Sequence, residues 1–180
     1  MSDLWVFGYG SLMWRPGFSH LEAVPARLIG AHRALCVYSW VHRGTKDRPG
    51  LVLGLDHGGS CRGIAFRVDS KSRDAVVTYL RERELVTSVY REVHRNVRLL
   101  AASRTVKALA FVVDRRHEQY AGALPPDRLL DLVRYSEGRS GANADYVVNT
   151  VRHLDTLGVH DPVLGWLADR LAGKDARRRA

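Results

Sequence analysis

The feature that most constrains this chain is an apolar strand that runs directly into two closely spaced glycines. Residues 5–7 (Trp-Val-Phe) are bulky and uncharged, as in a short buried β-strand. Gly8 and Gly10 then flank Tyr9. Glycine tolerates positive φ and lets a ligand approach the bare backbone. The chain therefore begins with a core strand that ends in an adaptable turn.

This turn is a candidate binding site for a carboxylate or an oxyanion. The backbone N–H groups of Tyr9, Gly10, Ser11 and Leu12 can point into one small space. Met13 occupies the position of the third glycine in a dinucleotide fingerprint, and no Gly-Lys-Ser/Thr triplet of a P-loop occurs. A plain hairpin turn between two core strands remains the alternative.

Most of the predicted strands precede most of the predicted helices. Strands are expected over residues 24–40 (one long or two short), 51–55, 61–68, 90–100 and 106–114. Residues 56–59 are expected to form a turn that joins strands 51–55 and 61–68 into a hairpin. Regular βαβ alternation is absent, so we expect an α+β fold, with a mixed or antiparallel sheet curled into a small barrel and flanked by helices.

Four helices are predicted from their capping residues and apolar spacing. The first covers residues 70–84, with Asp69 or Ser70 as N-cap. The others start at Pro126, at Asn143 as a cap, and at Asp161-Pro162, the last ending near Gly173. No linker or repeat divides the chain. We expect one domain over residues 1–173 and a basic, disordered tail over 174–180.

Composition narrows the class of protein. A hydrophobic content of 46% in 180 residues is enough for one substantial core. No apolar run approaches the roughly 20 residues of a membrane-spanning helix. The N-terminus lacks the pattern of a signal peptide, which favours a cytoplasmic protein that does not act at a membrane. The oligomeric state is not predictable from the sequence.

The net charge of +9 requires nucleic-acid binding to be considered. The basic residues are scattered, however, and form no aromatic-interleaved stripe or known module. We therefore expect no nucleic-acid partner. The same positive charge would equally attract an anionic small molecule.

Cys36 and Cys61 are expected to be buried thiols. Since no metal-ligand motif and no Gly-x-Ser-x-Gly elbow occurs, we expect neither a metal nor a covalent serine mechanism.

Glu84 is the candidate catalytic residue. It lies four residues after Leu80 and seven after Val77, so helical spacing places it on the inner side of the first predicted helix. An inward carboxylate has a raised pKa, which suits a general base near neutral pH. The alternative is a frayed helix end, where Glu84 pairs at the surface with Arg81 or Arg83.

The opening stretch 6–14 resembles that of the ChaC family, whose members are γ-glutamylcyclotransferases that act on glutathione. The Arg83-Glu84 pair is similar to the one that carries the catalytic glutamate there, and the run to Tyr90 resembles the bacterial branch in particular. Further resemblances lie at residues 42–50, 114–120 and 141–146. Cys36 and Val37 depart from the family, since some members carry an aromatic residue there.

The resemblance implies a fold, a reaction and a set of site residues. It implies that Glu84 acts as general acid and base, and that Tyr9 to Leu12, Arg43 and Tyr146 bind substrate. Without the resemblance, the sequence also allows Arg43 to be a solvent-exposed charge in a loop. It likewise allows Tyr146 to be a core aromatic residue. The expected reaction is cyclisation of the γ-glutamyl group of glutathione to 5-oxoproline with release of Cys-Gly, a carbon–nitrogen lyase reaction. We expect no cofactor, because this reaction includes neither a redox step nor an activated group transfer. The alternatives are a cyclotransferase for other γ-glutamyl amines or dipeptides, and a non-catalytic basic binding or regulatory module.

Overall fold

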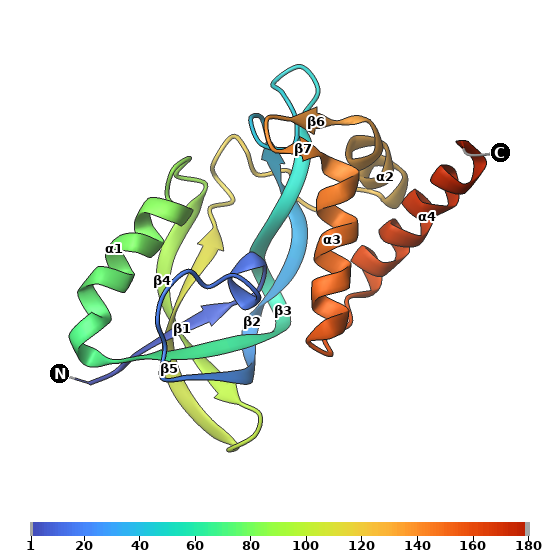
Figure 1. Cartoon of the computed structure of the whole chain (residues 1–180). Helices are drawn as coiled ribbons and strands as arrows, with labels where there is room; N and C mark the ends of the chain where they lie inside the picture. The colour runs from blue at the N-terminus through green and yellow to red at the C-terminus, as the bar shows by residue number, and fades with distance from the viewer. Residues whose placement is uncertain (1, 179–180) are drawn as a thin grey trace. The chain divides into compact units, whose positions relative to one another are not determined.

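The computed structural model describes residues 2–178, with side chains as far as Gly173. These residues form two compact units (Figure 1). The first unit comprises Met1–Ala34 and Leu53–Tyr120, and the second comprises Leu35–Val52 and Ala121–Ala180. Each unit is described by itself below. The single domain expected over residues 1–173 stays a prediction.

The sheet is a closed five-stranded barrel, as predicted. Its strands are β1 (Leu4–Gly8), β2 (Glu22–Ser39), β3 (Gly50–Val68), β4 (Tyr90–Leu99) and β5 (Arg104–Val113). They pair in the order β1-β3-β2-β4-β5, and β1 closes the barrel by pairing with β5. The β1–β5 pair is parallel, whereas β1–β3, β2–β4 and β4–β5 are antiparallel. The sheet is therefore mixed, and helices complete the predicted α+β class.

The hairpin predicted around residues 56–59 is wrong. β3 is one continuous strand of 19 residues that runs through these positions. Gly58 (φ +96°) and Gly59 (φ +69°) absorb a local distortion instead of reversing the chain. The carbonyl of Gly58 is within hydrogen-bonding distance of His32 Nδ1 on β2, at 3.0 Å. Two consecutive glycines within a strand thus mark an irregularity rather than its end.

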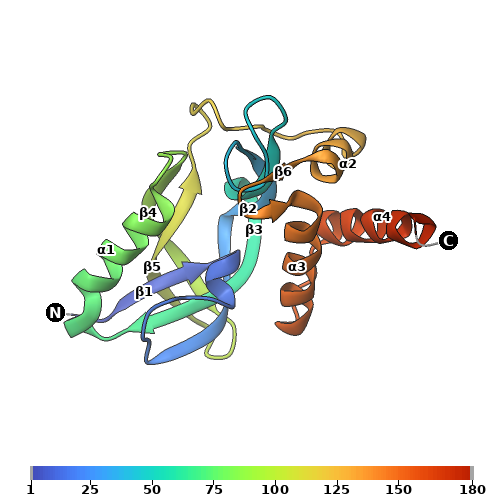
Figure 2. The same ribbon diagram turned by 45° about the horizontal axis from the view of Figure 1, so that its top comes forward.

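The helix of the first unit packs on the barrel through aromatic side chains. A short 3-10 turn, η2 (Ser70–Ser72), leads into α1 (Arg73–Glu84), and Asp69 caps the turn as predicted by accepting from the backbone N–H of Lys71. α1 lies along one side of the barrel strands in both views (Figures 1 and 2). Phe18 makes edge contacts with Tyr79 of α1, at 6.3 Å, and with Phe66 of β3, at 5.7 Å. This cluster fixes the side of α1 that faces the sheet.

The second unit contains three helices and a very short hairpin. Its elements are α2 (Pro126–Tyr135), β6 (Glu137–Gly138), β7 (Gly141–Ala142), α3 (Asn143–Thr156) and α4 (Pro162–Arg178). The β6–β7 turn separates α2 from α3, and Gly141 in this turn has φ +100°. Asp161 caps α4 as predicted, because its carboxylate accepts from the N–H of Leu164 at 3.1 Å.

Two predicted helix boundaries in this unit are wrong. Asn143 is the first residue of α3 and not its cap, since Ala142 holds the N-cap position without a side-chain bond. α4 continues beyond Gly173, because the following lysine, aspartate, alanine and arginines all tolerate helix. The expectation of a disordered tail over residues 174–180 stays a prediction, and residues 179 and 180 lie outside the described part.

None of the helices described combines the length and the apolar character that crossing a bilayer requires.

Candidate active site

The glycine turn of the opening stretch sits at the end of β1, as expected. A 3-10 turn, η1 (Ser11–Met13), follows the strand, and its first hydrogen bond runs from Met13 N–H to Gly10 O at 2.9 Å. The N–H groups of Ser11 and Leu12 come before that bond, so the turn itself does not use them. A Cβ on Gly8 would lie 3.1 Å from Leu12 Cβ. Gly8 therefore allows the turn to fold back tightly over the strand end.

The side chains of this turn differ in exposure. Tyr9 and Leu12 are buried, whereas Ser11 is exposed. Arg33 of β2 fixes the turn from outside, since its Nε donates to Tyr9 O at 2.6 Å. The sequence analysis did not identify Arg33, because the contact joins residues that are 24 positions apart. The turn thus presents backbone groups and one hydroxyl rather than a pocket of large side chains.

Glu84 is the last residue of α1 and faces inward, as the spacing predicts. Its side chain is 18% exposed, and Leu80, one turn earlier, is fully buried. The Arg83 guanidinium is its ion-pair partner, with Nε 3.3 Å from Glu84 Oε1. Burial raises the pKa of the Glu84 carboxyl, and the charge of Arg83 only partly opposes this. Glu84 is therefore a partly accessible carboxyl poised to accept a proton nearer neutral pH than an exposed glutamate.

Arg83 connects Glu84 to the glycine turn. Its Nη2 donates to Ser11 Oγ at 2.9 Å, and its Nη1 donates to Arg15 O at 2.7 Å and to Tyr79 Oη at 3.0 Å. One guanidinium thus holds the end of α1 against residues 11–15. In the sequence, Arg83 stands out only as part of a motif and as a possible surface partner of Glu84. Its role here rests on contacts with residues about 70 positions earlier, which no local pattern reveals.

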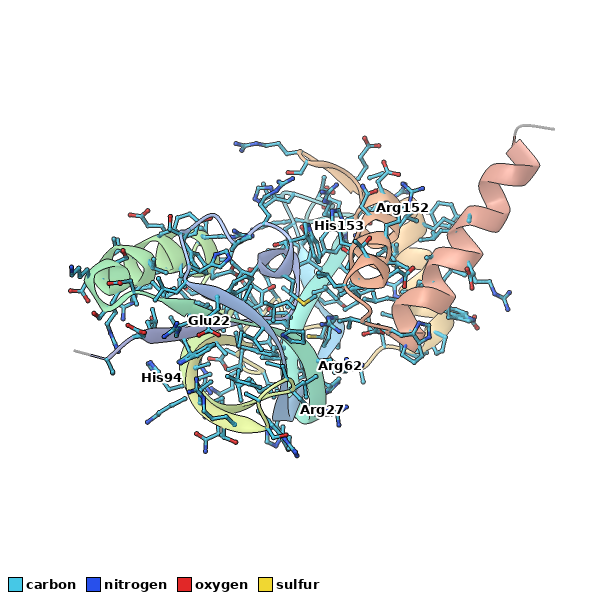
Figure 3. The ribbon with its side chains drawn as sticks, turned by 60° about the horizontal axis from the view of Figure 1, so that its bottom comes forward. Glu22, Arg27, Arg62, His94, Arg152 and His153 are labelled. Carbon is cyan, nitrogen blue, oxygen red and sulfur yellow. The ribbon has the colours of Figure 1, made fainter. Side chains whose placement is uncertain are left out.

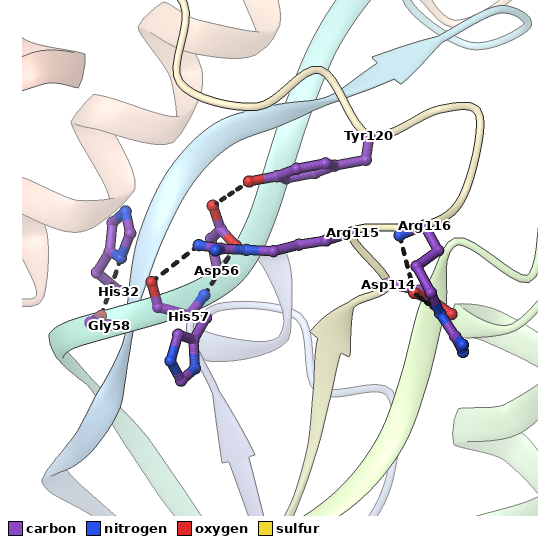
Figure 4. A network of polar contacts seen from close by, with 8 residues as sticks. All are labelled: His32, Asp56, His57, Gly58, Asp114, Arg115, Arg116 and Tyr120. Atoms are coloured by element: carbon purple, nitrogen blue, oxygen red, sulfur yellow. Dashed lines mark hydrogen bonds and ion pairs between the residues drawn. The ribbon is translucent and has the colours of Figure 1, made fainter.

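A second polar network fixes the segment after β5 to β3 (Figure 4). Asp56 is buried and accepts from Arg115 Nε at 2.7 Å and from Tyr120 Oη at 2.8 Å. Burial acts to raise the pKa of Asp56, but the hydrogen bonds from Arg115, Tyr120 and the His57 N–H outweigh it and lower the pKa below its ordinary value. Asp56 is thus a fixed anion, unlike Glu84.

The second unit brings Arg43 and Tyr146 together. The Arg43 guanidinium lies over the Tyr146 ring, 5.4 Å from its centroid, and its Nη1 donates to Ser140 O at 2.6 Å. Both residues are half-buried, so neither is a free loop charge nor a core aromatic residue. A stacked guanidinium is well suited to bind a carboxylate in two-point fashion.

Asn143 fixes the segments that carry these two residues. The sequence predicted it only as a helix cap and not as a residue that supports the site. Its side chain is buried and bonds both ways to Leu51, accepting from the N–H at 2.7 Å and donating to the carbonyl at 2.8 Å. It mimics a strand partner for the start of β3. The start of α3, which carries Tyr146, is thereby fixed close to the loop that carries Arg43.

Within residues 2–178, no three histidine, cysteine, aspartate or glutamate side chains come close enough to hold a metal ion. Cys36 and Cys61 are buried free thiols, as predicted. That the protein uses neither a metal nor a cofactor stays a prediction.

Comparison with solved structures shows the fold. The crystal structure of a yeast γ-glutamyl cyclotransferase specific to glutathione superposes with a TM-score of 0.84 over 96% of this chain and 97% of that one, at 20% identity. The likeness confirms the predicted barrel with flanking helices as a fold that γ-glutamyl cyclotransferases adopt.

Comparison with curated proteins extends the likeness to sequence. The glutathione-specific γ-glutamylcyclotransferase of Escherichia coli is 35% identical over 158 residues, which cover 88% of this chain and 68% of the relative. The human glutathione-specific γ-glutamylcyclotransferase 1 is 31% identical over 160 residues, with coverage of 86% and 71%. The profile of the ChaC-like protein family matches residues 4–172, which include every predicted site residue. The chain belongs to the ChaC-like protein family.

Proposed function

We propose that this protein is a glutathione-specific γ-glutamylcyclotransferase, with Glu84 as its general acid and base. The names of the Escherichia coli and human relatives support the reaction and its substrate. The observation that carries the proposal is the position of Glu84. Its carboxyl is mostly buried, has a raised pKa, and is joined through Arg83 to a turn with unused N–H groups.

The reaction is an intramolecular aminolysis. Glu84 removes a proton from the α-ammonium group of the γ-glutamyl residue, and the freed amine attacks the γ-carbonyl carbon. The new carbon–nitrogen bond closes the five-membered ring of 5-oxoproline, and the bond to the cysteine nitrogen breaks. Glu84 returns a proton to that leaving nitrogen, and Cys-Gly departs. The α-nitrogen loses two protons in all and the cysteine nitrogen gains two: Glu84 transfers the first, and the second leaves the ring nitrogen after attack and is replaced on the departing amine by exchange with solvent. No water is consumed.

The remaining site residues orient the substrate. The N–H groups in the turn of Tyr9, Gly10, Ser11 and Leu12 would bind the α-carboxylate or the oxyanion that develops on the γ-carbonyl oxygen. Because nucleophile and electrophile belong to one molecule, orientation and proton transfer supply most of the rate enhancement.

Arg43 and Tyr146 are proposed to bind substrate. The guanidinium of Arg43 suits a carboxylate, and the hydroxyl of Tyr146 can donate or accept a hydrogen bond.

Neither oxidation nor activated group transfer occurs in the reaction, so the proposal includes no cofactor. It places the enzyme in the cytoplasm, where glutathione maintains a reducing environment.

The test is product formation by purified wild-type protein and by the Glu84→Gln variant. Both are incubated with glutathione, and 5-oxoproline and Cys-Gly are measured by mass spectrometry. We expect both products from the wild type and a loss of turnover of about 100- to 10,000-fold in the variant. Glu82→Gln is the matched control, since Glu82 lies on the same helix but is exposed. A folded Glu84→Gln enzyme with wild-type turnover would show that another group is the base.

The second candidate is a cyclotransferase for other γ-glutamyl amines or dipeptides. A relative from Arabidopsis thaliana, 30% identical over 175 residues, is named only γ-glutamylcyclotransferase 2-3. A panel of γ-glutamyl dipeptides distinguishes the two, because only the second candidate predicts comparable kcat/KM values without the Cys-Gly half. A non-catalytic binding module predicts no product from any of them.

A further inference from the structure

A second, basic groove lies in the first unit, apart from Glu84 and the glycine turn. It has a volume of about 290 Å³ and is lined by β2, β3, β4, β5 and the turn that follows β5. Its charged and titratable lining residues are His57, Arg91, Arg95, Asp114, Arg115 and Arg116. Neither Glu84, Arg83 nor Ser11 lines it. Four guanidinium groups therefore surround one cavity that the proposed reaction does not use.

β2 and β4 contribute to the groove beyond the segment where they pair. In the part of the chain that the structure describes, the two strands pair where Ala26–Leu28 meets Val97–Leu99. Beyond this ladder, Gly30 and Ala31 of β2 and Arg91 and Arg95 of β4 line the groove. Gly30 has φ +92° and leaves open space where a Cβ would stand. At Gly30, therefore, no side chain fills the space next to the groove.

Arg91 and Arg95 project from the same face of β4. They are four residues apart in a strand, and residues at even spacing share a face. In the part of the chain that the structure describes, neither has an ion-pair partner within 4.0 Å. Both are exposed. The nearest acidic residue that lines the groove, Asp114, instead pairs with Arg116 at 3.5 Å.

Asp114 is the acidic residue among those that line the groove. Its pKa is lowered, first by the hydrogen bond from the backbone N–H of Arg116; burial opposes this, and the side chain of Arg116 and the charge of Arg91 lower the pKa by smaller amounts. One carboxylate thus faces several cations. The groove keeps an excess of positive charge even after its own acidic residue is counted.

Arg115 is held rigidly at the edge of the same groove. Asp56 accepts from its Nε at 2.7 Å, the His57 carbonyl accepts from its Nη2 at 3.1 Å, and its guanidinium lies 5.8 Å from the Tyr120 ring centroid (Figure 4). A guanidinium fixed in this way loses little conformational freedom when an anion binds. The groove therefore combines one preorganised cation, Arg115, with two, Arg91 and Arg95, that form no ion pair within 4.0 Å in the described part of the chain.

We propose that this groove is a binding site for a chain of phosphate groups, free or as part of a nucleotide. Planar guanidinium groups match phosphate oxygens in two-point fashion. Arg91 and Arg95 are separated by about 13 Å along the strand, so their side chains suit a di- or triphosphate better than a single phosphate. The site is independent of the proposed cyclotransferase reaction.

The experiment compares two double variants that lose the same charge. Arg91→Gln/Arg95→Gln removes the two groove cations that form no ion pair in the described part of the chain. Arg27→Gln/Arg62→Gln removes two exposed arginines that do not line the groove, on β2 and β3 (Figure 3). Affinity for tripolyphosphate and for ATP is measured by titration calorimetry at constant ionic strength. Melting temperature and glutathione turnover are measured in parallel for all three proteins.

We expect the wild type and the Arg27/Arg62 variant to bind tripolyphosphate, and the Arg91/Arg95 variant to bind at least about tenfold more weakly, because it loses two charge-assisted contacts. Binding of ATP alone would assign the site to a nucleotide, and equal binding of both would assign it to the phosphate chain.

Three outcomes would overturn the proposal. The first is that the wild type binds neither tripolyphosphate nor ATP, and the second is that both double variants lose the same affinity. The third comes from a competition experiment: the wild type binds an oligonucleotide that tripolyphosphate does not displace. Should the double variant fail to fold, the single variant Arg95→Gln replaces it, with Arg62→Gln as control.

Discussion

Arg83 Nη2 donates a hydrogen bond to Ser11 Oγ at 2.9 Å, while Nε of the same guanidinium lies 3.3 Å from the carboxylate of Glu84. The proposed base and the proposed anion-binding turn are therefore two partners of one cation. The bond joins the end of α1 to the η1 turn that follows β1, 72 residues earlier in the chain.

Arg83 is expected to position Glu84. Arg83→Ala should lower kcat/KM by about 10- to 100-fold, since small misplacement of a catalytic group costs that much. It should also move the acid limb of the pH profile to higher pH, because the charge that lowers the pKa of Glu84 is gone. Arg81→Ala is the control, as Arg81 is exposed and pairs with Glu92. A loss of rate with an unchanged pH profile would show a merely structural role.

The raised pKa of Glu84 has a predictable effect on activity and stability. A base must be deprotonated, so kcat/KM should rise with pH through a limb above 4.5, the ordinary glutamate value. For stability, the unfolded state releases its proton first as pH rises, so the contribution of Glu84 is fully present below about 4.5 and lost through the folded-state pKa.

Glu84→Gln should therefore melt no lower than wild type at pH 7, and the difference should shrink toward pH 4. Thermal melts across this range measure it, and a variant that is clearly less stable at pH 7 would contradict a desolvated carboxylate.

The stacked pair in the second unit should act on substrate binding. Arg43→Lys keeps the charge but loses the planar group that lies over Tyr146 and donates to Ser140 O. We expect KM for glutathione to rise about tenfold with little change in kcat. Arg48→Lys, on the same loop and exposed, is the matched control and should leave KM unchanged. Equal KM values for Arg43→Lys and wild type would remove Arg43 from the substrate site.

The buried amide of Asn143 is expected to contribute to folding. Asn143→Ala leaves the N–H and carbonyl of Leu51 without their partner, which should lower the free energy of unfolding by about 1–3 kcal/mol. Asn149→Ala, at an exposed position of the same helix, should change it by less than about 0.5 kcal/mol. Urea denaturation of both variants makes the comparison, and equal stability would mean that Leu51 finds other partners.

The sequence by itself determined that strands precede most helices, that Asp69 caps the turn leading into α1, and that Glu84 faces inward, because periodicity and capping are local properties. It also predicted a mixed or barrel-like sheet, since strands came without βαβ alternation. It failed at Gly58 and Gly59, where local turn chemistry predicted a reversal and pairing with neighbouring strands kept β3 continuous.

Asn143 shows the same limit in a helix. Its residue type predicts a cap, yet the buried edge of β3 offered its amide two stronger partners.

Only the tertiary structure decided which distant groups meet. The contacts of Arg83 with Ser11, and of Arg115 with Asp56, span 72 and 59 residues. The basic groove likewise joins residues of β2 and β4 beyond the segment where they pair, which no sequence pattern marks. Such features arise because a barrel brings together strand ends that are remote along the chain, and the energies that fix them belong to three-dimensional contacts rather than to local propensity.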